Sequence, residues 1–160
     1  MLVSFFESIK YIGHQYPIAF FRIYLGFHFL SSALYRAQSG FLERPQLSGM
    51  IQEFLPSSSA SDWYKTFLES VVVPQWQFFA YSITYLEFII AISLIIGLLV
   101  RPISLVAIAL CINFIFISDP GSAELYKLFV AVFITMAWVG AGRCLGADYY
   151  FFKRQRGIWF

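Results

Sequence analysis

The sequence is poor in charged residues. Charged side chains make up 12% of its 160 residues, against about 25% in a typical soluble domain. The 11 basic and 9 acidic side chains leave a net charge of +2, spread along the chain. A nucleic-acid-binding arm requires a block of basic residues, so this dispersed charge excludes nucleic acid as a partner.

Cysteine is almost absent, and so are the short motifs of common cofactor sites. Cys111 and Cys144 form neither a CxxC pair nor a Cys/His cluster, so we expect no metal site and no redox disulfide. The chain contains no GxGxxG, Walker, HExxH or CxxCH motif. The sequence therefore carries no signature of a flavin, nucleotide, haem-attachment or iron–sulfur site.

Hydrophobic and aromatic residues are abundant instead, at 59% and 21%, with a mean hydropathy of +0.70. Four apolar runs cover residues 17–35, 76–100, 102–118 and 124–140. Each run is long enough to cross a bilayer as a helix. The sequence predicts an all-α integral membrane protein, a four-transmembrane-helix bundle that forms one domain over residues 1–160.

Two further segments have helical apolar patterns. Phe5, Phe6 and Ile9 form a stripe at helical spacing, which predicts either a short helix on the membrane surface or an extension of the first span. The long loop 36–75 predicts two amphipathic helices separated at Pro56. These two helices either only complete the fold or cover a ligand entrance.

The basic residues predict the orientation of the bundle. With the N-terminus inside, seven lysines and arginines lie inside and four lie outside, and the tail 141–160 dominates the bias. Positive charge is retained on the inner side of a membrane. We therefore expect both termini to lie inside.

Three spans each carry a strongly polar residue near the same depth, namely His28, Glu87 and Asn113. The helical rise places all three roughly 16–20 Å from the inner face. Such residues turn inward and pair, and a functional site is their default interpretation. We expect Glu87 to pair with His28, and Asn113 to serve as a hydrogen-bond donor or acceptor. The three polar residues at this depth form either a reactive pocket or a structural polar cluster.

Basic residues suggest further contacts. Arg22 either extends to the inner interface or pairs with Glu87. At the predicted outer end, Arg36 and Lys127 form a potential charge cluster with Asp119 and Glu124. This outer cluster is either an ion-pair network or a site for an anionic substrate or a quinone carbonyl.

Several short motifs resemble the DoxX/DoxD family of small membrane proteins, over about residues 17–152. The first span contains Phe21-Arg22 followed by Leu25-Gly26, the second contains Glu87 followed by Gly97 and Arg101, and the chain closes with Gly142-Arg143, Gly146 and Asp148. The sequence departs from the family pattern at Arg36, where a lysine is usual. Arginine keeps the charge but changes the geometry of a substrate contact.

The resemblance implies a bacterial or archaeal inner-membrane protein linked to quinone redox chemistry. The DoxD branch is the small subunit of thiosulfate:quinone oxidoreductase, although fold transfers between relatives better than function. The leading hypothesis is thus a quinone-interacting subunit of a redox complex, which contacts the bilayer and other subunits. Its catalytic residues would be Glu87 and His28, and its quinone-binding residues would be Arg22, Arg36, Arg101, Asn113 and Lys127.

Two alternatives remain. In the first alternative, the chain is a non-catalytic accessory subunit of a larger respiratory or photosynthetic complex, in which His28 would ligate a pigment or haem. It is otherwise a small proton-coupled transporter, with Glu87 as the proton-carrying carboxylate.

Overall fold

The computed structural model describes residues 16–143 and 146–148, and these residues form helices and the turns that join them. The amphipathic helix expected near Phe5 and most of the tail 141–160 lie outside the described residues. The elements are α2 (Tyr16–Gln38), α3 (Gln46–Phe54), α4 (Asp62–Phe67), the π-helical turn η2 (Leu68–Val72), α5 (Trp76–Ile96), α6 (Val100–Ile117), α7 (Pro120–Val139) and the 3-10 turn η3 (Ala141–Arg143).

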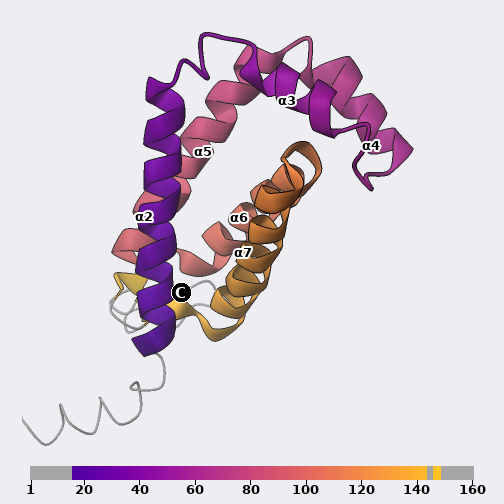
Figure 1. The fold of residues 1–160 in the computed structure, drawn as a ribbon. Helices are drawn as coiled ribbons and strands as arrows, with labels where there is room; N and C mark the ends of the chain where they lie inside the picture. The colour runs from indigo at the N-terminus through magenta and orange to yellow at the C-terminus, as the bar shows by residue number, and fades with distance from the viewer. Residues whose placement is uncertain (1–15, 144–145, 149–160) are drawn as a thin grey trace, which may run out of the picture.

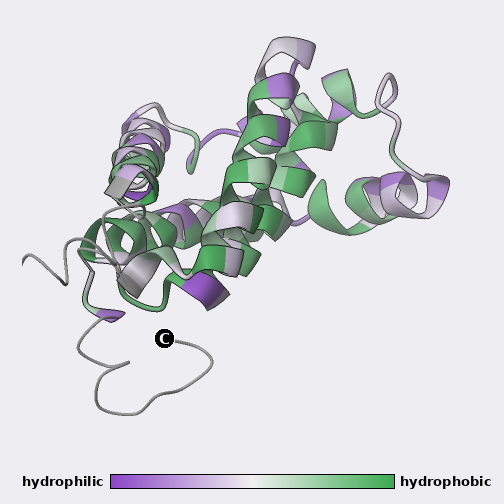
Figure 2. Cartoon of the chain, turned by 90° about the horizontal axis from the view of Figure 1, so that it is seen from below, coloured by the Kyte–Doolittle hydropathy of each residue, from purple (hydrophilic) through white to green (hydrophobic). Residues whose placement is uncertain are grey.

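Four of these helices are long and apolar enough to cross a membrane, which confirms the predicted four-helix membrane bundle. They cover Pro17–Gln38, Trp76–Ile96, Val100–Ile117 and Pro120–Val139. Hydrophobic residues predominate along them, as the green ribbons of Figure 2 show. The chain is a multi-pass membrane protein.

The turn between α5 and α6 lies inside the apolar run that we expected to be helical up to residue 100. Gly97 ends α5 in the left-handed conformation, with φ of 74°, and its N–H donates to the carbonyl of Ser93 over 2.8 Å. Leu99 also has a positive φ, of 53°. Arg101 and Pro102 belong to the first turn of α6, where a proline removes no intrahelical hydrogen bond. Hydropathy alone does not reveal such a turn, because its residues are as apolar as the helix.

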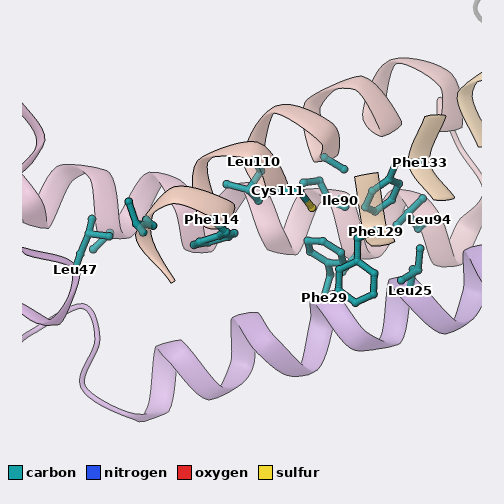
Figure 3. Close-up of a cluster of buried hydrophobic side chains, with 14 of the residues drawn as sticks. Leu25, Phe29, Leu47, Ile90, Leu94, Leu110, Cys111, Phe114, Phe129 and Phe133 are labelled. Atoms are coloured by element: carbon teal, nitrogen blue, oxygen red, sulfur yellow. The ribbon is translucent and has the colours of Figure 1, made fainter. Parts of the chain in front are cut away.

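The long helices are arranged as two pairs, α2 beside α5 and α6 beside α7. Figure 1 shows α2 and α5 on one side and α6 and α7 on the other. Gly26 allows the first pair to approach closely, because a Cβ there would lie 2.7 Å from the Ile95 side chain. Aromatic side chains join the two pairs. Phe29 of α2 packs against Phe129 and Phe133 of α7, with 6.1 and 5.7 Å between ring centroids (Figure 3).

The segment between α2 and α5 folds into α3, α4 and η2, which confirms the predicted amphipathic pieces. The first span runs to Gln38, so Arg36 lies in α2 and not in the predicted loop. Leu47 and Ile51 are the buried residues of α3, and Leu68 and Val72 are those of η2. These elements lie at the end of the bundle opposite to η3 (Figure 1). Their apolar sides thus pack over the end of the bundle that contains the start of α5.

Candidate functional site

The Glu87 carboxylate is buried in the middle of α5 and pairs with two side chains of α2. Glu87 is 1% exposed, and its Oε1 atom lies 3.4 Å from Nη2 of Arg36. The Ser32 hydroxyl donates to the same oxygen over 3.5 Å. Ser32 and Arg36 are one turn apart on α2, so both reach α5 from one helix face. Opposite charges thus lie inside the bundle, where desolvation is costly unless they stay together.

Aromatic rings enclose the guanidinium of Arg36. Its Cζ atom lies 4.5 Å from the ring centroid of Phe114 and 5.3 Å from that of Phe41. Phe114 stacks on Tyr126 with 5.0 Å between centroids, and Tyr126 interacts electrostatically with Arg36. A cation against an aromatic face is stabilised, more strongly where water is excluded. These rings therefore favour a position of Arg36 inside the bundle.

His28 and Asn113, which we expected beside Glu87, have other surroundings. The His28 ring packs edge-on against Phe129, with 5.0 Å between centroids. Asn113 lies on an exposed face of α6. Within the described part of the chain, the carboxylate of Glu87 is paired with the two α2 side chains named above instead. Depth along a helix is set by residue number, but the partner is set by rotation about the helix axis, which packing decides.

A cavity of about 430 Å³ lies between α5 and α6 and is also lined by α3, α4 and η2. Its volume is within the usual range of small-molecule sites, about 300–1,000 Å³. Most of its lining is apolar, and it includes Phe78, Leu86 and Val106. These three side chains are exposed on the membrane-spanning helices. The cavity is therefore bordered by exposed apolar side chains of the membrane-spanning helices.

A hydrogen-bonded polar pair lies on the wall of this cavity. The Tyr64 hydroxyl of α4 donates to Oδ1 of Asn113 on α6, and both residues line the cavity. Nδ2 of Asn113 donates to the carbonyl of Ala109 over 2.7 Å. Burial raises the pKa of Tyr64 above its usual 10.0, so the hydroxyl is protonated at neutral pH. The pair places polar groups within reach of a ligand in an otherwise apolar space.

Arg22 and Arg101 lie at the opposite end of the bundle, where α5 turns into α6. Arg22 is fully buried, and its Nη1 atom donates to the carbonyl of Ala141 over 2.8 Å. Its guanidinium packs against Gly97, where an added Cβ would lie 2.7 Å from Nη1. Arg101 lies against Gly140, at the end of α7. Neither arginine lines the cavity, and Arg22 joins α2 to the start of η3.

Asp148 belongs to a clasp at this end of the bundle, which consists of Arg22, Gly97 and the segment 146–148. The Asp148 carboxylate accepts the backbone N–H groups of Leu99 over 2.6 Å and Val100 over 3.0 Å. Its own N–H donates to the carbonyl of Gly97 over 3.0 Å. A carboxylate at the start of a helix satisfies free N–H groups and complements the helix dipole. The clasp thus fixes the first turn of α6.

The expected outer cluster of Arg36, Asp119, Glu124 and Lys127 is not assembled. Nζ of Lys127 lies 2.6 Å from Oε1 of Glu124, and both side chains are exposed on α7. Asp119 caps α7 by accepting a backbone N–H over 3.0 Å. Arg36 turns inward to the buried carboxylate. An exposed pair like that of Lys127 contributes little to stability.

The sequence pattern placed Ser32 only on the polar face of the first span that carries His28, and it did not single out Tyr64 or Phe114 as site residues. The spacing of four residues between Ser32 and Arg36 was the available signal for their shared face. Tyr64 belonged to the predicted apolar stripe of the loop. Phe114 is one of 19 phenylalanines, so residue type alone could not distinguish it.

Comparison with known proteins returned one family. The DoxX family model matches residues 18–119, which is more than half of the chain. The match includes α2 to α6, and with them both residues of the buried ion pair and the lining of the cavity. It ends before α7 and before the closing motif of Gly142 to Asp148. Neither a curated protein nor a solved structure matches the chain.

Proposed function

The chain belongs to the DoxX family, and from this premise we propose that it binds a quinone within the membrane as a subunit of a redox complex. The cavity between α5 and α6 carries the proposal. Its apolar lining suits the ring and isoprenoid tail of a quinone, and its exposed rim residues Phe78, Leu86 and Val106 give access from the bilayer. A water-soluble substrate would gain little from either property.

The polar pair on the cavity wall fits a quinone oxygen. The Tyr64 hydroxyl, whose proton is donated to Asn113, would turn to donate it to a quinone oxygen. The N–H of Asn113 that is not donated to Ala109 is a second donor. A hydrogen bond in an apolar site orients the ligand and penalises molecules that cannot make it. A bound quinone would carry electrons and protons for a partner subunit, while Tyr64 and Asn113 would hold the head group.

Tyr64→Phe tests this assignment. The substitution removes a hydroxyl and keeps the ring, so it should weaken binding of ubiquinone-1 about fivefold, the effect of one neutral hydrogen bond. Binding is measured by quenching of tryptophan fluorescence in lipid nanodiscs. Trp63 is a suitable reporter because its ring centroid lies 5.7 Å from that of Tyr64.

Tyr81→Phe is the matched control. Tyr81 lies on α5 and stacks on Tyr85, with 6.3 Å between centroids, and it does not line the cavity. Its variant should bind ubiquinone-1 like the wild type. A wild-type protein that binds no ubiquinone-1, and whose solvent extract contains phospholipid but no quinone, would overturn the proposed function.

A further inference from the structure

We propose that the buried Arg36–Glu87 pair is a second hydrogen-bonding end of the quinone site, and that Phe114 is the partition between this pair and the cavity. The inference rests on the function proposed above. It adds two charged residues and one aromatic residue to a site that Tyr64 and Asn113 otherwise define.

The ion pair has hydrogen-bonding capacity that the described residues do not use. Oε2 of Glu87 and Nη1 of Arg36 are both buried, and neither has a hydrogen-bond partner within residues 16–143 and 146–148. The Glu87 side chain is 2% exposed and that of Arg36 is 13% exposed. Buried polar atoms are rarely left without a partner, since each loses its hydration. Oε2 of Glu87 is therefore an available acceptor, and Nη1 of Arg36 is an available donor on a guanidinium that also interacts with Tyr126.

Phe114 belongs to both sites. Its side chain lines the cavity, and its ring centroid lies 4.5 Å from Cζ of Arg36. The residue is 1% exposed, and Figure 3 shows its ring among the buried side chains near Leu110 and Cys111. A change in the orientation or size of this one ring would connect the cavity with the ion pair.

The chemistry of the two groups matches the two redox forms of a quinone. The oxidised form offers carbonyl oxygens that only accept, and Arg36 only donates. The reduced form offers hydroxyl groups that donate, and an ionised Glu87 only accepts. The pair can therefore serve both forms, through Arg36 for the quinone and through Glu87 for the quinol.

Glu87→Gln provides a test that a structural role alone would not satisfy. Glutamine preserves the shape but replaces the charged acceptor. Affinity for ubiquinol-1 should fall about tenfold, because hydrogen bonds to charged groups are the stronger ones. Affinity for ubiquinone-1 should change much less. Both ligands are measured by equilibrium dialysis under anaerobic conditions, and the readout is the ratio of the two dissociation constants.

Phe114→Leu is a second variant, which leaves the buried charges intact. A smaller side chain should open the passage to Arg36, so both ligands should bind severalfold more tightly. In the wild type, the apparent affinity is reduced by the fraction of molecules in which Phe114 closes this passage. Phe133→Leu is the matched control. Phe133 is fully buried, does not line the cavity and packs against Phe29 instead. It should leave both affinities unchanged.

The outcomes separate the two proposals. If ubiquinone-1 binds and Tyr64→Phe weakens it, the proposed function stands. In that case, an unchanged quinol-to-quinone ratio in Glu87→Gln overturns the inference about the ion pair. Should Glu87→Gln not fold, equal affinities in Phe114→Leu and Phe133→Leu overturn it instead.

Discussion

At the scale of single residues, the buried charges of Arg36, Glu87 and Asp148 each face a particular partner. Arg36 faces the Glu87 carboxylate, and the Asp148 carboxylate faces two backbone N–H groups. A charge in the interior is tolerated only with such a partner, and loss of one partner leaves the other exposed to the full desolvation cost. The sequence identified the charges in the spans, but it did not identify which residues would meet.

Asp148→Asn should destabilise the protein by about 2 kcal/mol, which is typical of a hydrogen bond to a charged group. An asparagine can accept only one of the two N–H groups, and its own amide would face the other. The prediction is checked by thermal unfolding in mild detergent. An unfolding midpoint equal to that of the wild type would show that the carboxylate does not stabilise the first turn of α6.

Asp119→Asn is the matched control for a helix cap that is exposed. The hydrogen bond from the Ser122 backbone N–H lowers the pKa of Asp119 below its usual 3.8. A lowered folded-state pKa adds stability above the unfolded pKa, and this stability is lost as pH falls through the folded value. The wild type should therefore be slightly more stable than the variant at neutral pH, and the two stabilities should become equal in acid.

At the scale of elements, the helix ends decide where the spans lie. Gly97 and Gly140 both end helices in the left-handed conformation, with φ of 74° and 71°. The end of α7 at Val139 agrees with the predicted span to within one residue. The end of α5 at Ile96 differs from the predicted span, because the residues after Gly97 are apolar and do not indicate a turn. Pattern and length predicted each helix, whereas the caps set its limits.

Gly97→Ala should destabilise the protein by about 2 kcal/mol or more. An L-residue pays about 1–2 kcal/mol for a left-handed backbone, and the added Cβ would lie 2.6 Å from the Cα of Gly146. Thermal unfolding measures the loss. Gly49→Ala is the control, because a Cβ there meets nothing within 4 Å. Alanine favours a helix, so that variant should be at least as stable as the wild type. Equal midpoints for Gly97→Ala and wild type would contradict the strain.

At the scale of the whole molecule, two helix pairs are joined by aromatic packing. The α2–α5 pair carries Glu87 and Arg36, while α6 supplies Phe114 and shares the cavity with α5. Both candidate sites therefore lie where elements from different parts of the chain meet. Figure 1 shows α3 and α4 at the end of the bundle opposite to the turn between α5 and α6.

The orientation in the membrane remains a prediction from the basic residues. With both termini inside, a cysteine at Ser59, an exposed residue between α3 and α4, should react with a membrane-impermeant maleimide in intact cells. A cysteine at Gln155 should react only after the membrane is permeabilised. Both variants carry Cys144→Ser, and that background alone should not react. The reverse labelling pattern would show the opposite orientation.

The sequence by itself determined that the chain is a four-helix membrane protein, because the hydropathy and length of each apolar segment follow from the order of residues along the chain. It also placed Glu87 in the middle of a span. Only the tertiary structure decided that Glu87 meets Arg36 and Ser32, that Asn113 meets Tyr64, and that Phe114 contacts both Arg36 and the cavity. The physical reason is that side-chain partners depend on the rotation and approach of helices. The rotation and the approach of the helices are set by packing, as at Gly26. They cannot be predicted from the hydropathy pattern of a single sequence.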